Sequence, residues 1–378
     1  MNYALNEEQQ ILRDSAHSFL AKECTGSLVR EMAEDEKGFT SDLWRKMSQL
    51  GWMGILFPEE YGGHEGSFLD LAVLLYEMGY VCLPGPYFST VVLGGITLLE
   101  AGTEAQKEDI LPKLASGDEI LTLAWTEISG TYSAQGISVK AELHNGHYVL
   151  SGTNLFVPDA HVADKIICAA RTQEPQDDYE KGVSLFIVDA ESSGMGLRVL
   201  STLAADKQCE ITFDQVKVPG ENLVGEIDEG WSVLRNVLHK ASVAKCAEMS
   251  GGAQRAIDLV VPYIKEREQF GRPVGSFQAV KHHCANILTY VDTSKFMTFQ
   301  AAWRISEGLP FETEASMCKA WVSDSYRQAV ALSHQCIGGI GFMEEHDLQL
   351  YFKHAKAAEL AFGDANFHRE LVAQQMVL

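Results

Sequence analysis

The stretch from Arg267 to Asn286, which reads REQFGRPVGSFQAVKHHCAN, constrains the fold of this chain more than any other. Its first residues are the charged end of one helix. Gly271 can adopt the positive φ of a turn, and Pro273 fixes a φ from which the next helix can begin. An arginine and an aromatic ring therefore stand at the junction of two helices. Arg267 can bind a phosphate in a forked contact, and Phe270 offers a flat face to a ring. From composition alone, a helical corner with a solvated arginine is the simpler interpretation.

Helical periodicity dominates the chain from Gly230 onward. Several segments exceed the average globular helix, which predicts a bundle of long helices in residues 229–378. Helices of that length often meet copies of themselves. The predicted helices are 229–268, 274–305, 312–338, 345–361 and 364–376.

The first 119 residues are also predicted to be helical, whereas residues 120–228 consist of short runs rich in β-forming residues. Asn145-Gly146 is a hairpin signal between two of these runs. We therefore predict an α+β multidomain fold, with an N-terminal helical domain at 1–119, a β-domain at 120–228 and a helix bundle at 229–378. Strand spacing alone allows a sandwich or a barrel. The predicted strands are 120–126, 137–143, 147–151, 164–171, 183–188 and 209–216.

Composition excludes several classes of function. The net charge of the 378 residues is −22, which argues against binding to nucleic acid or to an anionic membrane. No apolar run is long enough to span a bilayer, and the acidic N-terminus has neither the apolar core of a signal peptide nor the Arg-rich bias of a transit peptide. The eight cysteines are scattered without a C-x-x-C pair, which predicts reduced thiols, a cytoplasmic location and no metal site.

Two motifs carry a family resemblance. RxQFGxPxGxFQxxxH, from Arg267 to His282, resembles the hallmark of the acyl-CoA dehydrogenase family of flavoenzymes, with its spacing intact. QCIGGIGF, from Gln335 to Phe342, resembles the flavin-contacting QxxGGxGF of that family. The resemblance covers essentially the whole chain. It implies a β-barrel as the middle domain, a four-helix bundle at the C-terminus and tetramers built on that bundle. It also implies FAD as cofactor, an acyl-CoA thioester as substrate and an electron-transfer flavoprotein as acceptor.

The family removes an α-proton with a carboxylate and a β-hydride with the flavin, so it needs a base opposite the ring. By resemblance, the usual glutamate stands six residues beyond Lys356, and here that position holds Phe362. The other family position, on the first bundle helix, holds Ala241, and the neighbouring family arginine appears as Ser242. A phenyl ring has no lone pair to accept a proton. The sequence therefore predicts no catalytic base at either position.

Three polar residues near these positions are candidates for a substitute base. Asp364 follows Phe362 by two residues, but an Asx residue before the last helix is more commonly its N-cap. Glu248 lies about two turns, or roughly 10 Å, along the helix from Ala241. His239 points to another side of that helix. A polar residue without a catalytic role is the default interpretation for each, and Asp364 stays a weak candidate.

The resemblance places FAD between two subunits, and the two halves of that site are unequal in this chain. The β-domain half departs from the family pattern TEPxAGSD, because it reads TEISGTYS from Thr126. The tryptophan that covers the ring appears as Phe156, and the threonine that bonds the flavin appears as Pro158, which has no N–H and no hydroxyl. Each lost donor weakens binding by roughly 0.5–1.5 kcal/mol. The bundle half is retained, and its family contacts match Arg267, Gln269, Phe270, Gln278, Gln335, Gly338 and Gly339.

A chain that keeps the half lent to a neighbour but lacks a base resembles a helper subunit. The family includes heteromeric α2β2 dehydrogenases in which one chain lacks the base, associated with ring-bearing or steroid side-chain CoA thioesters. We therefore predict a non-catalytic subunit that completes the FAD site of a homologous catalytic chain. Three alternatives stay open: a self-sufficient homotetrameric dehydrogenase with an unusual base, a flavin monooxygenase or oxidase on the same fold, and a structural paralogue without flavin.

Overall fold

The computed structural model of the chain describes residues 5–175 and 177–376. The chain divides into two compact units. The N-terminal helices are shared between them, and the first long helix of the C-terminal region begins in one unit and continues in the other. The sheet unit comprises residues 32–66 and 84–238, and the bundle unit comprises residues 1–31, 67–83 and 239–378.

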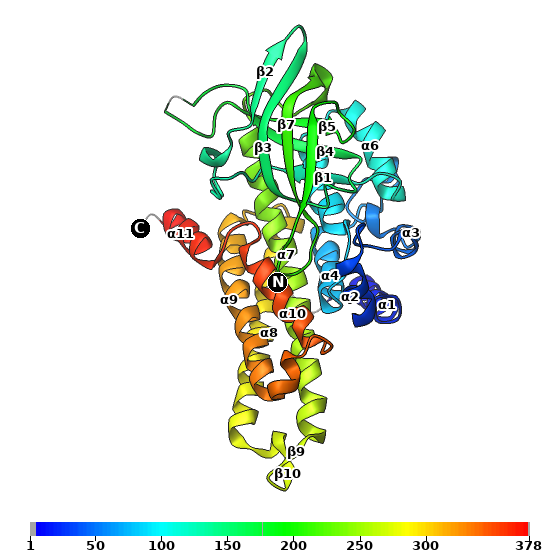
Figure 1. The fold of residues 1–378 in the computed structure, drawn as a ribbon, viewed down its shortest axis with the longest axis vertical. Helices are drawn as coiled ribbons and strands as arrows, with labels where there is room; N and C mark the ends of the chain where they lie inside the picture. Colours follow the sequence, from blue (N-terminus) through cyan, green and yellow to red (C-terminus); the bar gives the residue numbers. More distant parts are fainter. Residues whose placement is uncertain (1–4, 176, 377–378) are drawn as a thin grey trace. The chain divides into compact units, whose positions relative to one another are not determined.

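Long helices build the bundle unit, and α8 and α9 pack along one another (Figure 1). All the helices predicted beyond residue 229 are confirmed, with shifts of a few residues at their ends. No helix in the described part of the chain is both long and apolar enough to cross a membrane. The helices are α1 (Glu7–Glu23), α2 (Gly26–Glu34), which passes into the sheet unit, α4 (Phe68–Tyr80), α7 (Gly230–Glu266), α8 (Gln278–Ser306), α9 (Glu312–Ile337), α10 (Leu348–Leu360) and α11 (Ala365–Gln375).

Glycines allow α4 and α7 to approach each other closely. A Cβ atom added at Gly251 would lie 1.9 Å from the carbonyl oxygen of Tyr76. One added at Gly79 would lie 2.0 Å from the carbonyl oxygen of Glu248. Because no side chain fits between backbones at these points, glycine is required on both helices. The crossing fixes the position of α4 against the part of α7 around Glu248 and Gly251.

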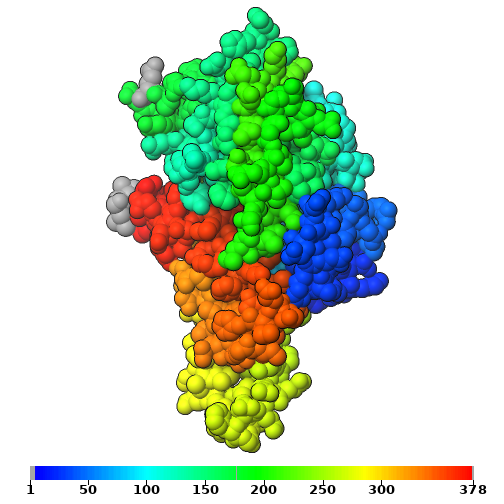
Figure 2. Space-filling view, viewed as in Figure 1, coloured from blue at the N-terminus to red at the C-terminus, as the bar shows by residue number. Residues whose placement is uncertain are grey.

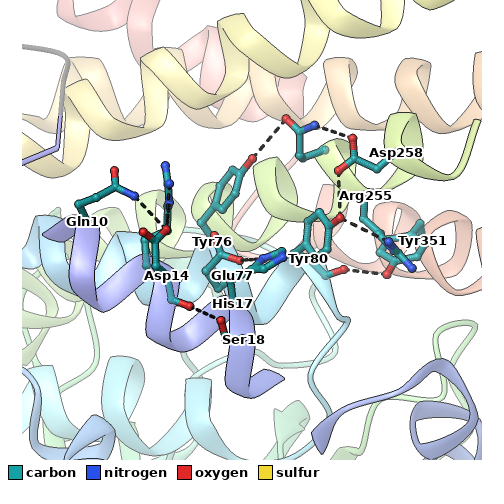
Figure 3. Close-up of polar contacts among 12 residues, drawn as sticks. Gln10, Asp14, His17, Ser18, Tyr76, Glu77, Tyr80, Arg255, Asp258 and Tyr351 are labelled. Carbon is teal, nitrogen blue, oxygen red and sulfur yellow. Dashed lines mark hydrogen bonds and ion pairs between the residues drawn. The ribbon is translucent and has the colours of Figure 1, made fainter. Parts of the chain in front are cut away.

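A polar network ties four helices of the bundle unit together (Figure 3). The hydroxyl of Tyr80, on α4, donates to Asp258 of α7 at 2.9 Å. The hydroxyl of Tyr351, on α10, donates to the carbonyl oxygen of Tyr80 at 2.7 Å. His17 of α1 lies 2.8 Å from the buried carboxylate of Glu77 on α4. Such directed bonds fix the register of helices that apolar packing alone leaves free to slide.

Eight strands form one sheet in the sheet unit, in the order β6-β7-β3-β2-β4-β5-β8, with β1 paired to β4. Pairs β1–β4 and β2–β4 are parallel and the other pairs are antiparallel. The strands are β1 (Leu121–Ala124), β2 (Lys140–His144), β3 (His147–Pro158), β4 (Lys165–Arg171), β5 (Val183–Asp189), β6 (Met195–Leu200), β7 (Gln208–Pro219) and β8 (Leu223–Val224). Apart from short 3-10 segments, the helices that lie wholly in this unit are α3 (Ser41–Gln49), the π-helix Phe88–Gly95, α5 (Ile96–Ala101) and α6 (Glu104–Ser116).

The predicted strands are all present, and the hairpin signal is confirmed. Asn145 and Gly146 have φ of 51° and 83°, and they join β2 to β3 as a two-residue turn. β3 and β7 are longer than predicted, because they pair with each other along most of their length. The sequence pattern does not predict β6, an edge strand in which Leu197 and Val199 are exposed and a glycine interrupts the β-forming residues.

Candidate functional site

A pocket of about 380 Å³ opens in the bundle unit, lined by residues from the ends of α7 and α9. It brings Arg267 and Gln269, from the first motif, beside Gly339 from the second. The Arg267 side chain is exposed and forms no ion pair with any described residue. A free guanidinium, an amide and an open glycine backbone are a donor set that fits the phosphate and polar edge of a dinucleotide such as FAD. The lining residues are Tyr263, Arg267, Gln269, Val274, Cys336, Ile337, Gly339 and Ile340.

Gly338 and Gly339 leave open space beside the backbone. Gly338 ends α9 with φ of 76°, and its N–H donates to the carbonyl oxygen of His334. A Cβ atom added at either glycine would meet no atom within 4 Å. The missing side chains therefore leave room for a ligand. The predicted contacts Gln278, at the start of α8, and Gln335, near the end of α9, are both exposed and lie outside the pocket lining.

The first motif contains a small hairpin inserted in the predicted helical junction. β9 (Glu268–Gln269) pairs with β10 (Arg272–Pro273) at the end of the α7–α8 pair (Figure 1). Phe270 and Gly271 both occupy the left-handed region, with φ of 53° and 75°. Phe270 is 92% exposed, and its ring stands edge-on to Phe277 with 6.1 Å between centroids. Figure 2 shows this region, in yellow, at the surface. A strained and exposed aromatic residue is unusual in a plain turn.

The β-domain contacts predicted for FAD lie in the sheet unit. Thr126 follows β1, and its carbonyl oxygen accepts the N–H of Leu155 at 2.8 Å. Phe156 follows Leu155 on β3. It has φ of 54° at the point where the pairing of β3 with β7 shifts register, and it is 58% exposed. Pro158 ends the strand without an N–H to offer. The structure therefore brings Thr126 beside the strand of Phe156, whereas the other predicted contacts belong to the bundle unit.

Two buried charged side chains shape the loop that follows Thr126. The Glu127 carboxylate accepts the N–H groups of Ser138 at 2.7 Å and Val139 at 2.9 Å. The Arg171 guanidinium donates to carbonyl oxygens at 2.5 to 3.2 Å. The loop after Thr126 is therefore held by Glu127 and Arg171, neither of which is among the residues that differ from the family pattern. The carbonyl acceptors of Arg171 are those of Ala134, Ile137, Tyr179 and Lys181.

Neither position that the resemblance predicts for a base carries a group that accepts a proton. Ala241 is fully buried on α7. The next residue, Ser242, is also buried and donates its hydroxyl to the carbonyl oxygen of His239 at 2.7 Å. Phe362 lies in the turn between α10 and α11, with φ of 59°. The described geometry therefore offers only apolar side chains at these two positions.

Both carboxylates considered as substitutes have structural partners. Asp364 caps α11, because its Oδ1 atom accepts the N–H of Phe367 at 2.8 Å. The capping interpretation of Asp364 is thus confirmed. Glu248, half-buried on α7, is paired with Lys245 one turn earlier. These contacts give each carboxylate a role in the fold.

Five residues that line the pocket were not predicted as site residues: Tyr263, Val274, Cys336, Ile337 and Ile340. Tyr263 precedes Arg267 by one helical turn, and its carbonyl oxygen accepts the Arg267 N–H at 2.8 Å. The i, i+4 spacing was the available signal. Cys336 directly follows Gln335 and is buried, and burial raises the pKa of its thiol to about 12. The thiol therefore stays protonated and unreactive at neutral pH.

Comparison with known families accounts for nearly the whole chain. Three family models match in succession: acyl-CoA dehydrogenase N-terminal domain at residues 6–118, middle domain at 122–216 and C-terminal domain at 228–377. With the helical and sheet architecture, they define a multidomain flavin-dependent oxidoreductase. The chain belongs to the acyl-CoA dehydrogenase family, whose members bind FAD and act on CH–CH bonds.

Relatives match over the full length of the chain. A probable acyl-CoA dehydrogenase, YngJ, from Bacillus subtilis is 32% identical, with 100% of both chains covered. Butyryl-CoA dehydrogenase from Megasphaera elsdenii has a TM-score of 0.92 at 26% identity, with 100% of both chains covered. A chain of the ChsE4-ChsE5 complex from Mycobacterium tuberculosis has a TM-score of 0.91 at 26% identity, covering 100% of this chain and 99% of that one. The predicted fold class is therefore confirmed.

Proposed function

We propose that this chain is the base-lacking subunit of a heteromeric acyl-CoA dehydrogenase and that it completes the FAD site of a homologous catalytic chain. One imbalance carries the proposal. The pocket retains Arg267, Gln269 and Gly339, whereas Ala241 and Phe362 occupy the two base positions. A chain without a carboxylate at these positions lacks the group that is expected to remove the α-proton of a thioester. Retained cofactor contacts without a base suit a subunit whose contacts serve its neighbour.

Two further observations support a heteromeric partner. The residues of the sheet unit that differ from the family, Phe156 and Pro158, weaken the half of a flavin site that a self-sufficient chain needs. The similar chain from Mycobacterium tuberculosis comes from a complex of two named chains, ChsE4 and ChsE5. We infer an α2β2 assembly of this chain with a homologous subunit that carries the glutamate.

The described residues have distinct roles toward the cofactor in this proposal. When bound, FAD supplies the hydride acceptor for α,β-dehydrogenation of an acyl-CoA thioester. Arg267 binds a phosphate and Gln269 a polar edge, while Gly338 and Gly339 admit the dinucleotide close to the backbone. Phe270 presents its exposed ring to a flat group. We further propose an electron-transfer flavoprotein as acceptor and a cytoplasmic location, since all eight cysteines are free.

Purification of the chain alone, and together with a homologous family subunit that carries the glutamate, tests the proposal. We expect the lone chain to lack the yellow colour of FAD and to leave butyryl-CoA unchanged in the presence of an artificial electron acceptor. The pair should co-purify as a heterotetramer that binds FAD and turns over. Full FAD occupancy and turnover by the single chain would rule the proposal out.

A matched pair of arginine variants tests the pocket itself. In the complex, Arg267→Ala should weaken FAD binding by about 10- to 100-fold, because a hydrogen bond to a charged group contributes about 1.5–3 kcal/mol. Arg272→Ala is the control, since Arg272 is exposed on the same hairpin and its guanidinium lies 4.0 Å from the ring centroid of Phe277, outside the pocket. Equal losses in both variants would show that the pocket is not the site of contact.

A further inference from the structure

The turn between α10 and α11 is strained. Phe362 has φ of 59° and Gly363 has φ of 103°, and Asp364 then caps the next helix. A bulky residue with positive φ is rare, because its Cβ atom crowds its own backbone. Such a conformation persists only where the surrounding structure holds it. The contacts of this turn therefore indicate what imposes the conformation.

A buried ammonium group holds one side of the turn. Lys319 of α9 is fully buried, and its Nζ atom donates to the carbonyl oxygen of Gly363 at 2.9 Å. It also donates to the carbonyl oxygen of Glu359 at 3.0 Å and to the hydroxyl of Ser323 at 3.1 Å. Three donors thus meet three acceptors, and no carboxylate is among them. Burial lowers the pKa of Lys319 to about 8, so the group is mostly charged at neutral pH.

A buried histidine holds the other side. His368 of α11 is buried, and its Nε2 atom lies 3.0 Å from the carbonyl oxygen of Phe362. Burial, and then the nearby Lys319, lowers the pKa of His368 to about 3. The ring is therefore neutral at physiological pH, and Nε2 carries the proton that the carbonyl accepts. A Cβ atom added at Gly363 would lie 2.3 Å from the ring of Phe367, so glycine is required there.

A turn between two helices does not need this arrangement. A left-handed glycine and an aspartate cap are enough to end one helix and begin the next, and both are present. A buried ammonium ion without a carboxylate partner is costly. Here two buried donors from two helices converge on the consecutive carbonyl groups of Phe362 and Gly363. The backbone at residue 362 is thus fixed more firmly than chain reversal requires.

We propose that Lys319 and His368 are positioning residues that hold residue 362 in its left-handed conformation and so set the direction of its side chain. The inference deepens the proposed function, on which it rests for the meaning of position 362 as one of the two places where a base belongs. If Lys319 had only a packing role, its N–H donors would not be needed. An apolar side chain of equal length would then serve as well, because packing needs volume and not an N–H donor.

A thiol introduced by Phe362→Cys in the full-length chain reports on the position through its rate of reaction with a maleimide. In that background, Lys319→Met removes the donors and leaves an apolar chain one atom shorter. Lys319→Gln has the length of methionine and restores amide donors. His368→Leu and His368→Gln form a second pair, which tests the proposal even if Lys319→Met does not fold. We expect the Met and Leu variants to react at position 362 about tenfold faster, and the Gln variants to stay within about threefold of the parent.

Native Cys284 is the internal control, because it is only partly buried on α8 in the same unit and reports any general loosening. The proposal is supported if the rate of the maleimide reaction rises only at position 362 in the Met and Leu variants and returns towards the parent rate in the Gln variants. Equal rates at position 362 in all variants, or a parallel rise at Cys284, overturn it. The experiment needs neither FAD nor a thioester. Its failure is therefore distinct from failure of the proposed function, which is measured by flavin binding and turnover.

Discussion

The Nζ atom of Lys319 lies 2.9 Å from the carbonyl oxygen of Gly363, and this bond ties α9 to the turn between α10 and α11. The ammonium group has no carboxylate among its hydrogen-bond partners. Carbonyl dipoles balance its charge instead, including that of Glu359 in the last turn of α10, where a helix favours a cation. The stability of this unit therefore depends on the protonation of one buried side chain.

Comparison of the wild type with Lys319→Met measures that dependence. Burial lowers the pKa of Lys319 from 10.5 to about 8, so between these values the unfolded chain binds more protons than the folded chain. The contribution of Lys319 to the free energy of unfolding therefore rises with pH through this window, by up to about 3 kcal/mol, and is lost as the pH falls through 8. Urea unfolding of both chains at about pH 7 and about pH 10 gives the difference. If the free energies of unfolding of the two chains differ by the same amount at both pH values, this account is contradicted.

The protonation of His368 should lower the free energy of unfolding in acid. Burial lowers the pKa of His368 from 6.5 to about 3, so its contribution to stability is present above 6.5 and is lost as the pH falls towards 3. The loss amounts to up to about 5 kcal/mol. His368→Gln keeps an N–H donor but does not titrate, so its free energy of unfolding should fall less than that of the wild type between about pH 6.5 and about pH 4. His282→Gln, at an exposed position of α8, is the control and should follow the wild type.

The long helices were predictable because their apolar residues repeat at helical spacing over many turns. The segment 312–338, for example, forms α9 at Glu312–Ile337. The β9–β10 hairpin was not predicted, because strands of two residues leave no periodic signal. The positive φ of Gly271 followed from its lack of a side chain, but that of Phe270 did not, since bulky residues avoid the left-handed region.

The candidate site was predictable only in part. Motif spacing singled out Arg267, Gln269 and Gly339, which the pocket unites. The hydrogen bonds from Lys319 and His368 to the carbonyl groups of Gly363 and Phe362 were not predicted. Lys319 is far from Gly363 in sequence, and a lysine on a helix is usually solvated. Burial of that charge is decided by tertiary packing, which no local pattern encodes.

The exposed hairpin leads to opposite predictions for two neighbouring phenylalanines. Phe270 has φ of 53° and is 92% exposed, whereas Phe277 has φ of −78° and is partly buried. Phe270→Gly should leave the free energy of unfolding unchanged or raise it by up to about 1 kcal/mol, because glycine adopts positive φ without strain. Phe277→Gly should lower it by about 1 kcal/mol or more. Denaturant midpoints of the two variants measure this, and equal losses would mean that the positive φ of Phe270 carries no strain.

Asp364 offers a test that separates a helix cap from a catalytic base. Asparagine keeps the oxygen that accepts the N–H of Phe367 but cannot take up a proton as a carboxylate does. Asp364→Asn should therefore keep the free energy of unfolding within a few tenths of a kcal/mol, whereas Asp364→Ala should cost about 1 kcal/mol. In the reconstituted complex, both variants should oxidise butyryl-CoA at the wild-type rate, followed as reduction of an artificial acceptor. Loss of turnover in the stable Asp364→Asn chain would instead identify this carboxylate as the base, because that substitution removes the charge and leaves the cap in place.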